Sequence, residues 1–376
     1  MDFVKEEIFF EVIQVAIGFR KSLNRIFTEE EWRFVFSMVQ RQAVIGLTYE
    51  AVKKLSFENE KQKPPLAILL NWVAIAEQVA GQNKILNCHC VNVLKDLKKA
   101  GFQCCILKGQ GNALMYPNPL SRNTGDIDVL IRNANKEDLL NYVLNKNVTG
   151  YHYHHVEYVE EGSPVELHFH ACSMNNPTYH YRLNNWLTLE AEKSNIWDNQ
   201  VKLPNNVGDI SIPTIEYNLI FQLAHMMHHF FDEGIGLRQM IDYYYLLRNA
   251  KDDVRSKMED VRATLKYLNL YKFAGAVMYI MKEVLGLDEQ YLIVPVDERR
   301  GKTLLNEILK GGNFGHHSGL DQKNALKKYF QKTWRNMRLV KEYPAEALCE
   351  PFFRTWHFFW RLAHKYGWGG CPGHFF

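Results

Sequence analysis

The spacing of apolar residues changes twice along the chain, and each change predicts a different kind of secondary structure. Through the first hundred residues apolar positions recur at helical spacing, as at Leu66, Leu69 and Val73. Between residues 101 and 212 the apolar stretches are short and are separated by glycine, proline and asparagine, which is typical of strands and turns. From Pro213 the helical spacing returns. The pattern predicts an α+β protein in which a small mixed-sheet core is flanked by N- and C-terminal helical regions.

These changes divide the 376 residues into three expected regions, a number that the length allows. We expect an N-terminal helical region over residues 1–100, a core over 101–212 and a C-terminal helical region over 213–376. Local signals support the first boundary. Pro64-Pro65 is typical of a helix start, and Lys98-Lys99-Ala100-Gly101 is typical of a helix end, because it combines basic residues with a glycine.

Individual elements can also be predicted. Thr28 and Glu31 have the spacing of a capping box, and Phe27 and Trp32 are placed to pack around it as a hydrophobic staple. One core helix should begin after an Asn135 cap. Within the core we expect strands over 102–107, 126–131, 151–159 and 165–170, and helices over 112–116 and 136–144.

Composition narrows the class of protein. The hydrophobic content of 47% and aromatic content of 13% are enough for sizeable cores, so the chain should be folded. The net charge of +3 is too small for a general nucleic-acid-binding surface. The acidic N-terminus does not resemble a signal peptide, no apolar run is long enough to span a membrane, and seven cysteines are an odd number without a disulfide pattern. We therefore expect a cytoplasmic protein with reduced thiols and no membrane partner.

Two aspartates in an apolar strand are the first candidate for chemistry. Residues two apart in a strand share one face, so Asp126 and Asp128 should project together. Glu166 and His168 share a face of a later predicted strand in the same way. A neighbouring arrangement of the two strands would bring three carboxylates together, with His168 placed to orient Glu166.

Such carboxylates cannot all stay ionised in a poorly solvated site unless a cation lies among them. Oxygen ligands of this kind favour Mg²⁺ or Mn²⁺. Two such ions held by one set of carboxylates are suited to a phosphoryl-type displacement. An Asp-x-Asp triplet occurs about once by chance in a chain of this length, so the argument depends on the apolar strand around it and on the glycine turn before it.

The turn Lys108-Gly109-Gln110-Gly111 lies between a predicted strand and a predicted helix. Backbone N–H groups at such a turn can face a phosphate, and Gly109 allows the phosphate to approach closely. Lys108 supplies a point charge, and Arg122 can bind phosphate oxygens through two nitrogens. The turn and the carboxylates together predict a site for a phosphate-bearing substrate.

The same residues resemble the DNA polymerase beta-type nucleotidyltransferase superfamily. More closely, the chain is similar to a bacterial family described as uncharacterised nucleotidyltransferases. The motifs that carry this resemblance are Leu107-Lys-Gly109, Tyr116-Pro117, Arg122, Gly125-Asp-Ile-Asp128, Glu166-Leu-His168, His225, Gly236-Leu-Arg-Gln-Met-Ile-Asp242 and Tyr343-Pro344.

The resemblance implies an enzyme that moves a nucleoside monophosphate group from an NTP to an acceptor hydroxyl or phosphate and releases pyrophosphate. It implies Mg²⁺ dependence, with Asp126 and Asp128 binding both ions. Glu166 would be the third carboxylate, which either binds the ion nearer the acceptor or deprotonates the acceptor. Gly109 matches the glycine that cradles phosphate. An ATP-type nucleotide would be the substrate, and we expect a small-molecule acceptor rather than RNA.

Two other functions stay open. The superfamily usually has Gly-Gly or Gly-Ser where this chain has Gly109-Gln110, so the protein could be a catalytically inactive nucleotide-binding module. An RNA- or tRNA-directed transferase is the third possibility. A basic stretch over residues 323–341, in which Lys328, Lys332 and Arg335 form one helical stripe, is usually a solvated face but could bind a polyanion.

The C-terminal half offers weaker candidates. Arg238 and Asp242 are four residues apart in a predicted helix, a spacing whose usual meaning is an intrahelical ion pair. A cleft-facing Arg238 could instead reach a nucleotide. His225 and His229 have a spacing that can bind a metal, although histidines at such positions are more often core residues.

Overall fold

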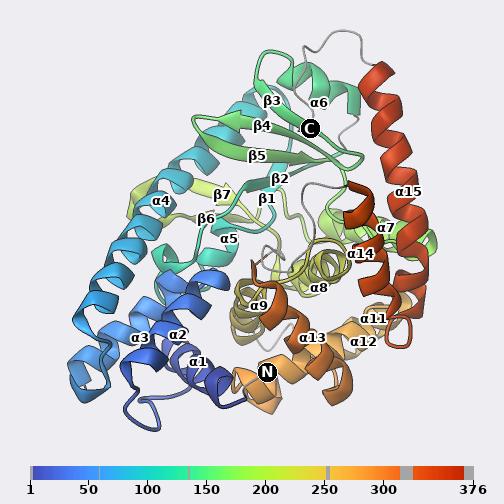
Figure 1. Cartoon of the computed structure of the whole chain (residues 1–376). Coiled ribbons are helices and arrows are strands. Elements are labelled where there is room, and N and C mark those ends of the chain that lie inside the picture. Colours follow the sequence, from blue (N-terminus) through green and yellow to red (C-terminus); the bar gives the residue numbers. More distant parts are fainter. Residues whose placement is uncertain (1–2, 59, 134–135, 251–254, 314–324, 368–376) are drawn as a thin grey trace.

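The computed structural model describes residues 3–58, 60–133, 136–250, 255–313 and 325–367. They form an α+β fold in which a five-stranded mixed sheet is surrounded by helices from both ends of the chain (Figure 1). The expected fold class is therefore confirmed. A second, two-stranded sheet lies in the same chain. The predicted Asn135 cap lies outside the described residues.

The first helices pack below the sheet in the view of Figure 1. The predicted capping box is confirmed: the Thr28 side chain accepts a hydrogen bond from the Glu31 N–H, and the Glu31 carboxylate accepts one from the Thr28 N–H at 2.8 Å. Phe27 and Trp32 pack beside it, with ring centroids 5.3 Å apart. The bounds of these helices are Phe3–Ala16 for α1, Glu29–Arg41 for α2 and Ile45–Glu58 for α3.

Helix α4 (Leu66–Lys99) has 34 residues and begins and ends where the proline pair and the Ala100-Gly101 stop predicted. Gly101 has φ +91°, a backbone conformation that glycine adopts without strain. The first half of α4 buries Trp72 in the core of the helical part, and the second half buries Leu94 in the core beneath the sheet. One helix thus belongs to both hydrophobic cores.

The five-stranded sheet has the order β1-β2-β5-β4-β3. Strands β2 and β5 are parallel, and the other neighbouring pairs are antiparallel. The bounds are Cys104–Ile106 for β1, Ile127–Ile131 for β2, Asn147–Tyr151 for β3, His155–Glu160 for β4 and Ser163–His168 for β5.

The strand that the sequence predicts over residues 151–159 is wrong in its bounds. Tyr151 ends β3, residues 152–154 form a connection, and β4 begins at His155. Strand β3 is mostly polar or exposed, so it lacks the alternation that reveals a half-buried strand. A tight turn at Glu161-Gly162, both with positive φ, joins β4 to β5.

The remaining elements extend from the sheet to the C-terminal helices. Helices α8 and α9 lie under the sheet, and α14 and α15 pack together at one side of the molecule (Figure 1). None of the described helices is both long enough and apolar enough to cross a membrane. The bounds are Gln110–Ala113 for α5, Lys136–Val143 for α6, Pro177–Lys193 for α7, Gln200–Lys202 for β6, Asp209–Ser211 for β7, Ile215–Phe231 for α8, Leu237–Asn249 for α9, Met258–Tyr267 for α11, Tyr271–Tyr279 for α12, Glu298–Gly311 for α13, Ala325–Met337 for α14 and Pro344–Gly367 for α15.

The basic stripe of α14 is not a solvated face. Lys332 is buried, and its Nζ lies 2.8 Å from a carboxylate oxygen of Asp232. Arg335 donates hydrogen bonds to the carbonyl oxygens of Phe231 and Asp232. Both side chains therefore attach α14 to the C-terminal end of α8, where free carbonyl groups favour cations.

Candidate active site

Parallel pairing of β2 with β5 brings the predicted carboxylates together. Asp128 lies directly opposite Glu166 in the strand register. Asp126 lies two residues before Asp128 and one residue before the first residue of β2, so the predicted strand starts one residue too early. One ligand atom each from Asp128, Glu166 and His168 lie within 4.8 Å of one another. The three carboxylates share one end of the parallel strand pair.

The carboxylates affect one another strongly because they are shielded from water. The neighbouring Asp128 charge, together with burial, raises the pKa of Asp126 to about 7. Burial alone would raise the pKa of Asp128 as well, but Lys108 and His168 hold it below its usual range. The site therefore keeps its negative charge by means of positive neighbours.

Lys108 and His168 are these neighbours. The Lys108 Nζ lies 3.0 Å from the Asp128 Oδ1 and donates a hydrogen bond of 2.7 Å to the His225 Nε2. The His168 Nε2 lies 3.2 Å from Asp128 and 3.1 Å from Glu166. Burial alone would lower the pKa of His168, but these two carboxylates raise it to about 9. His168 therefore holds both carboxylates in position.

The glycine turn has the backbone conformation that only glycine adopts readily. Gly109 has φ +51° and ψ −113° and directly precedes the four-residue helix α5. The next residue, Gln110, is buried and points to α4. Its side-chain amide donates hydrogen bonds to the side-chain oxygens of Asn83 and Asn87. Gln110, which stands where the superfamily usually has glycine or serine, thus attaches the turn to α4.

Arg122 forms a buried bidentate ion pair with Asp242 of α9. Its Nε and Nη2 each donate a hydrogen bond of 2.8 Å to one of the two carboxylate oxygens. The Tyr116 hydroxyl and the Asn112 amide also donate to Asp242, at 2.7 and 3.2 Å. The partner of Asp242 thus comes from a distant segment of the chain. The guanidinium of Arg122, which the sequence suggests as a phosphate ligand, is already paired with a carboxylate.

Arg238 of α9 also lines the cavity. Its Nη1 donates a hydrogen bond of 2.7 Å to the Thr124 carbonyl oxygen, just before the Gly125-Asp126 segment. The usual reading of the Arg238 and Asp242 spacing as an ion pair within the helix was incomplete, because the bidentate partner of Asp242 is Arg122. Arg238 also links α9 to the segment that carries Asp126.

A cavity of about 40 Å³ lies between the glycine turn, the aspartate segment and helices α8 and α9. This volume is enough for a small ion with water. Two wall residues that sequence reasoning did not identify, Asn112 and Gln222, hydrogen-bond to each other at 3.0 Å. In the sequence, these two residues differ from their neighbours only in being amides among the apolar residues of predicted helices. The predicted residues in the lining are Lys108, Gly109, Arg122, Asp126, Asp128, His225, Arg238 and Asp242, whereas Glu166 and His168 are not among the lining residues.

The donor set fits a hard divalent ion. Asp126 and Asp128 line the cavity, and their carboxylate oxygens are the ligands that Mg²⁺ and Mn²⁺ prefer. The pKa of Asp126 is raised because the carboxylate of Asp128 lies close to it. A bound cation would offset this repulsion between the two carboxylates. The residues of the chain are therefore compatible with the predicted metal chemistry.

Comparison with known proteins gives the class of protein to which this chain belongs, namely the nucleotidyltransferases. The sequence profile described as "Uncharacterised nucleotidyltransferase" matches residues 28–286, which is more than half of the chain. The chain belongs to this uncharacterised nucleotidyltransferase family. No curated protein and no solved structure gives a significant match.

Proposed function

We propose that the protein transfers a nucleoside monophosphate group from an NTP to an acceptor by the two-ion chemistry of the DNA polymerase beta-type superfamily. The family match supports nucleotidyl transfer in general. The observation that carries the finer proposal is the pairing of Asp128 with Glu166 across parallel strands, with Asp126 immediately before the strand. Two divalent ions bound there would neutralise the triphosphate and polarise the attacked phosphorus.

The residues of the chain have separate tasks in this proposal. Asp126 and Asp128 would hold the ions, and Glu166 would complete the set of carboxylates. The Lys108-Gly109 turn binds the triphosphate through its charge and its backbone. Arg122 positions this turn relative to α9, because its ion pair with Asp242 also binds Tyr116 and Asn112.

The reaction forms one bond and breaks one bond. The acceptor oxygen bonds to the α-phosphorus, and the bond from that phosphorus to the bridging oxygen breaks, so that pyrophosphate leaves with the electron pair. The acceptor's proton passes to Glu166. Burial would raise the pKa of Glu166, but the hydrogen bond from His168 keeps it below its usual value, so the carboxylate is ionised and can accept a proton.

The three-region division is part of the proposal. Residues 101–212 carry the carboxylates and the turn, and residues 213–376 close the cavity through α8 and α9. A small-molecule acceptor is favoured over RNA because Lys332 and Arg335 of the basic stripe are engaged with α8. The hydrogen bonds of Gln110 to α4 favour an active enzyme over an inactive module, since they leave the Gly109 backbone conformation intact.

The test is incubation of the protein with labelled NTPs and Mg²⁺, together with either total RNA or cell metabolites. We expect pyrophosphate release and label in the metabolite fraction. Asp128→Asn should abolish transfer and leave the circular dichroism spectrum unchanged. Label in RNA would replace the small-molecule acceptor by RNA. Binding of NTP without transfer to either fraction would support the inactive module.

A further inference from the structure

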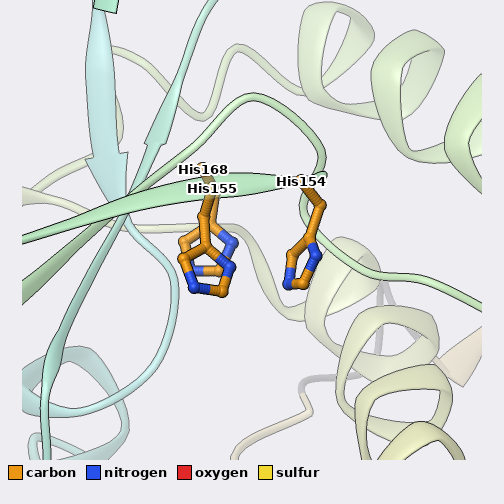
Figure 2. A group of neighbouring side chains, drawn as sticks. All are labelled: His154, His155 and His168. Atoms are coloured by element: carbon orange, nitrogen blue, oxygen red, sulfur yellow. The ribbon is translucent and has the colours of Figure 1, made fainter. Parts of the chain in front are cut away.

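We propose that His154, His155 and His168 form a binding site for a transition-metal ion of the Zn²⁺ class, next to the carboxylate site but distinct from it. One ring nitrogen from each of these three histidines lies within 4.8 Å of the other two. Figure 2 shows the rings of His154, His155 and His168 on the same side, with His155 on β4, His168 on β5 and His154 in the connection just before β4. The proposal does not depend on the transfer reaction.

The free nitrogens of the three rings are the first argument. The Nδ1 atoms of His154, His155 and His168 are all buried and have no hydrogen-bond partner among the described residues. An unpartnered buried nitrogen is costly. The three rings that carry these atoms form one small group. An ion bound between the rings would give the nitrogens a partner, and an imidazole nitrogen is a common ligand of Zn²⁺.

The Nε2 atoms of His155 and His168 already lie beside carboxylates, as the second ring nitrogen of a metal-binding histidine commonly does. The His155 Nε2 lies 3.0 Å from the Glu157 Oε1, and the His168 Nε2 lies close to both Asp128 and Glu166. A carboxylate at Nε2 holds the proton on that nitrogen and directs the lone pair of Nδ1 to the ion. The carboxylates also supply the negative charge that a buried dication needs.

The ring arrangement is close to what an ion would require. The ring centroids of His154 and His155 are 4.2 Å apart, and those of His155 and His168 are 5.0 Å apart. In a tetrahedral zinc site, nitrogen ligands about 2.05 Å from the ion lie about 3.3 Å from one another. The ring nitrogens lie within 4.8 Å of one another, so they would have to approach by at most about 1.5 Å to bind one ion. A water molecule would then complete the four ligands.

Imidazole nitrogen ligands distinguish this site from the proposed Mg²⁺ site. Nitrogen favours Zn²⁺, whereas the oxygen ligands of the carboxylate site favour Mg²⁺. His168 belongs to both groups of residues. Its Nε2 contacts the carboxylates of Asp128 and Glu166, and its ring also belongs to the histidine group. An ion at Nδ1 would take the place of the second ring proton and fix the ring that orients the two carboxylates.

The test uses the full chain without a histidine tag, freed of metal with EDTA and then saturated with Mg²⁺ to occupy the carboxylate site. Zn²⁺ binding is measured by calorimetry, and Co²⁺ is used as a probe whose visible absorption reports tetrahedral nitrogen ligands. We expect stoichiometric binding by the wild type. His154→Gln and His155→Gln should each weaken Zn²⁺ binding by at least about 100-fold and remove the Co²⁺ absorption.

Glutamine is chosen because it places an amide N–H near the position of Nε2 and leaves nothing at Nδ1. The matched control is His152→Gln, since His152 belongs to a neighbouring group with His155 and Glu157 that could itself bind an ion. This control should keep wild-type affinity. Equal melting temperatures in EDTA establish that the variants fold, and His155→Gln serves if His154→Gln does not fold.

Two outcomes overturn the proposal. One is a wild-type protein that binds Zn²⁺ no more tightly than His154→Gln. The other is a loss of binding in His152→Gln together with wild-type binding in His154→Gln, which assigns the ion to His152, His155 and Glu157 instead.

Discussion

Arg122 and Asp242 are 120 residues apart in the sequence and form a buried bidentate ion pair beside the cavity. The pair joins the loop before the aspartate strand to helix α9. Because Asp242 also accepts hydrogen bonds from Tyr116 and Asn112, one carboxylate holds three chain segments together. We infer that the pair fixes the geometry of the site.

Asp242→Asn should therefore destabilise the protein by about 3 kcal/mol, because it leaves the Arg122 charge buried without its counter-charge. Urea unfolding measures this difference. The matched control is Asp209→Asn, which changes an exposed aspartate and should cost less than about 0.5 kcal/mol. Equal losses in the two variants would show that the buried pair contributes nothing special to stability.

Asp126→Asn should have opposite effects on stability and on metal binding. It removes one of two neighbouring buried carboxylates, so we expect the ion-free protein in EDTA to gain about 1–2 kcal/mol. The same change should abolish transfer and the rise in melting temperature that Mg²⁺ gives the wild type. Thermal unfolding with and without Mg²⁺ measures both, and an unchanged Mg²⁺ response would remove Asp126 from the metal ligands.

Gln110→Ser should weaken the fold without removing the chemistry. The change leaves the buried side-chain oxygen of Asn87 without its donor, which costs about 1–3 kcal/mol. Transfer per folded molecule should stay within about threefold of wild type if the turn acts through its backbone. The exposed Gln82 provides the control, since Gln82→Ser removes a glutamine from α4 without a buried partner. A complete loss of transfer in folded Gln110→Ser would contradict this view of the turn.

Glu346, in the first turn of α15, should make stability depend on pH. Burial raises its pKa to about 7, although the backbone N–H groups of Asn175 and Asn176 donate to it. The folded pKa lies above the unfolded value of 4.5, so the folded state binds the proton more tightly. Stability is therefore greatest below the unfolded pKa and falls as the pH rises through about 7, by about 3 kcal/mol in total.

Glu346→Gln should remove this dependence. The difference in unfolding free energy between variant and wild type should increase in favour of the variant by about 3 kcal/mol between about pH 5 and about pH 8. Urea unfolding across this range measures it. Glu77→Gln, at an exposed position of α4, should show a constant difference. A constant difference for Glu346→Gln as well would mean that the carboxyl group is ionised without cost.

The features that the sequence predicted well are those with local causes. The Thr28 capping box and the ends of α4 follow from residues within one turn of each other. The proximity of Asp128 to Glu166 could be anticipated because both lie on apolar strands, and an alternating strand tells which side chains share a face. What the sequence could not tell was that the two strands are parallel neighbours.

The features that it predicted poorly depend on contacts between distant segments. No spacing rule connects Arg122 to Asp242 or Lys332 to Asp232. The polar strand β3 depends on pairing with β4 rather than on its own apolar pattern. The grouping of His154 and His155 with His168 arises only when β4 and β5 form their hairpin.

Helix α4 has a practical consequence for anyone seeking a smaller fragment of this protein. At about 1.5 Å per residue it is about 50 Å long, and it holds the turn through Asn83 and Asn87 while Trp72 is anchored among the N-terminal helices. Truncation to the sheet alone would leave an apolar face of this helix uncovered. An expression fragment that begins at the helix would therefore be prone to aggregate. To produce the sheet region on its own, the apolar residues of that helix face would first have to be redesigned.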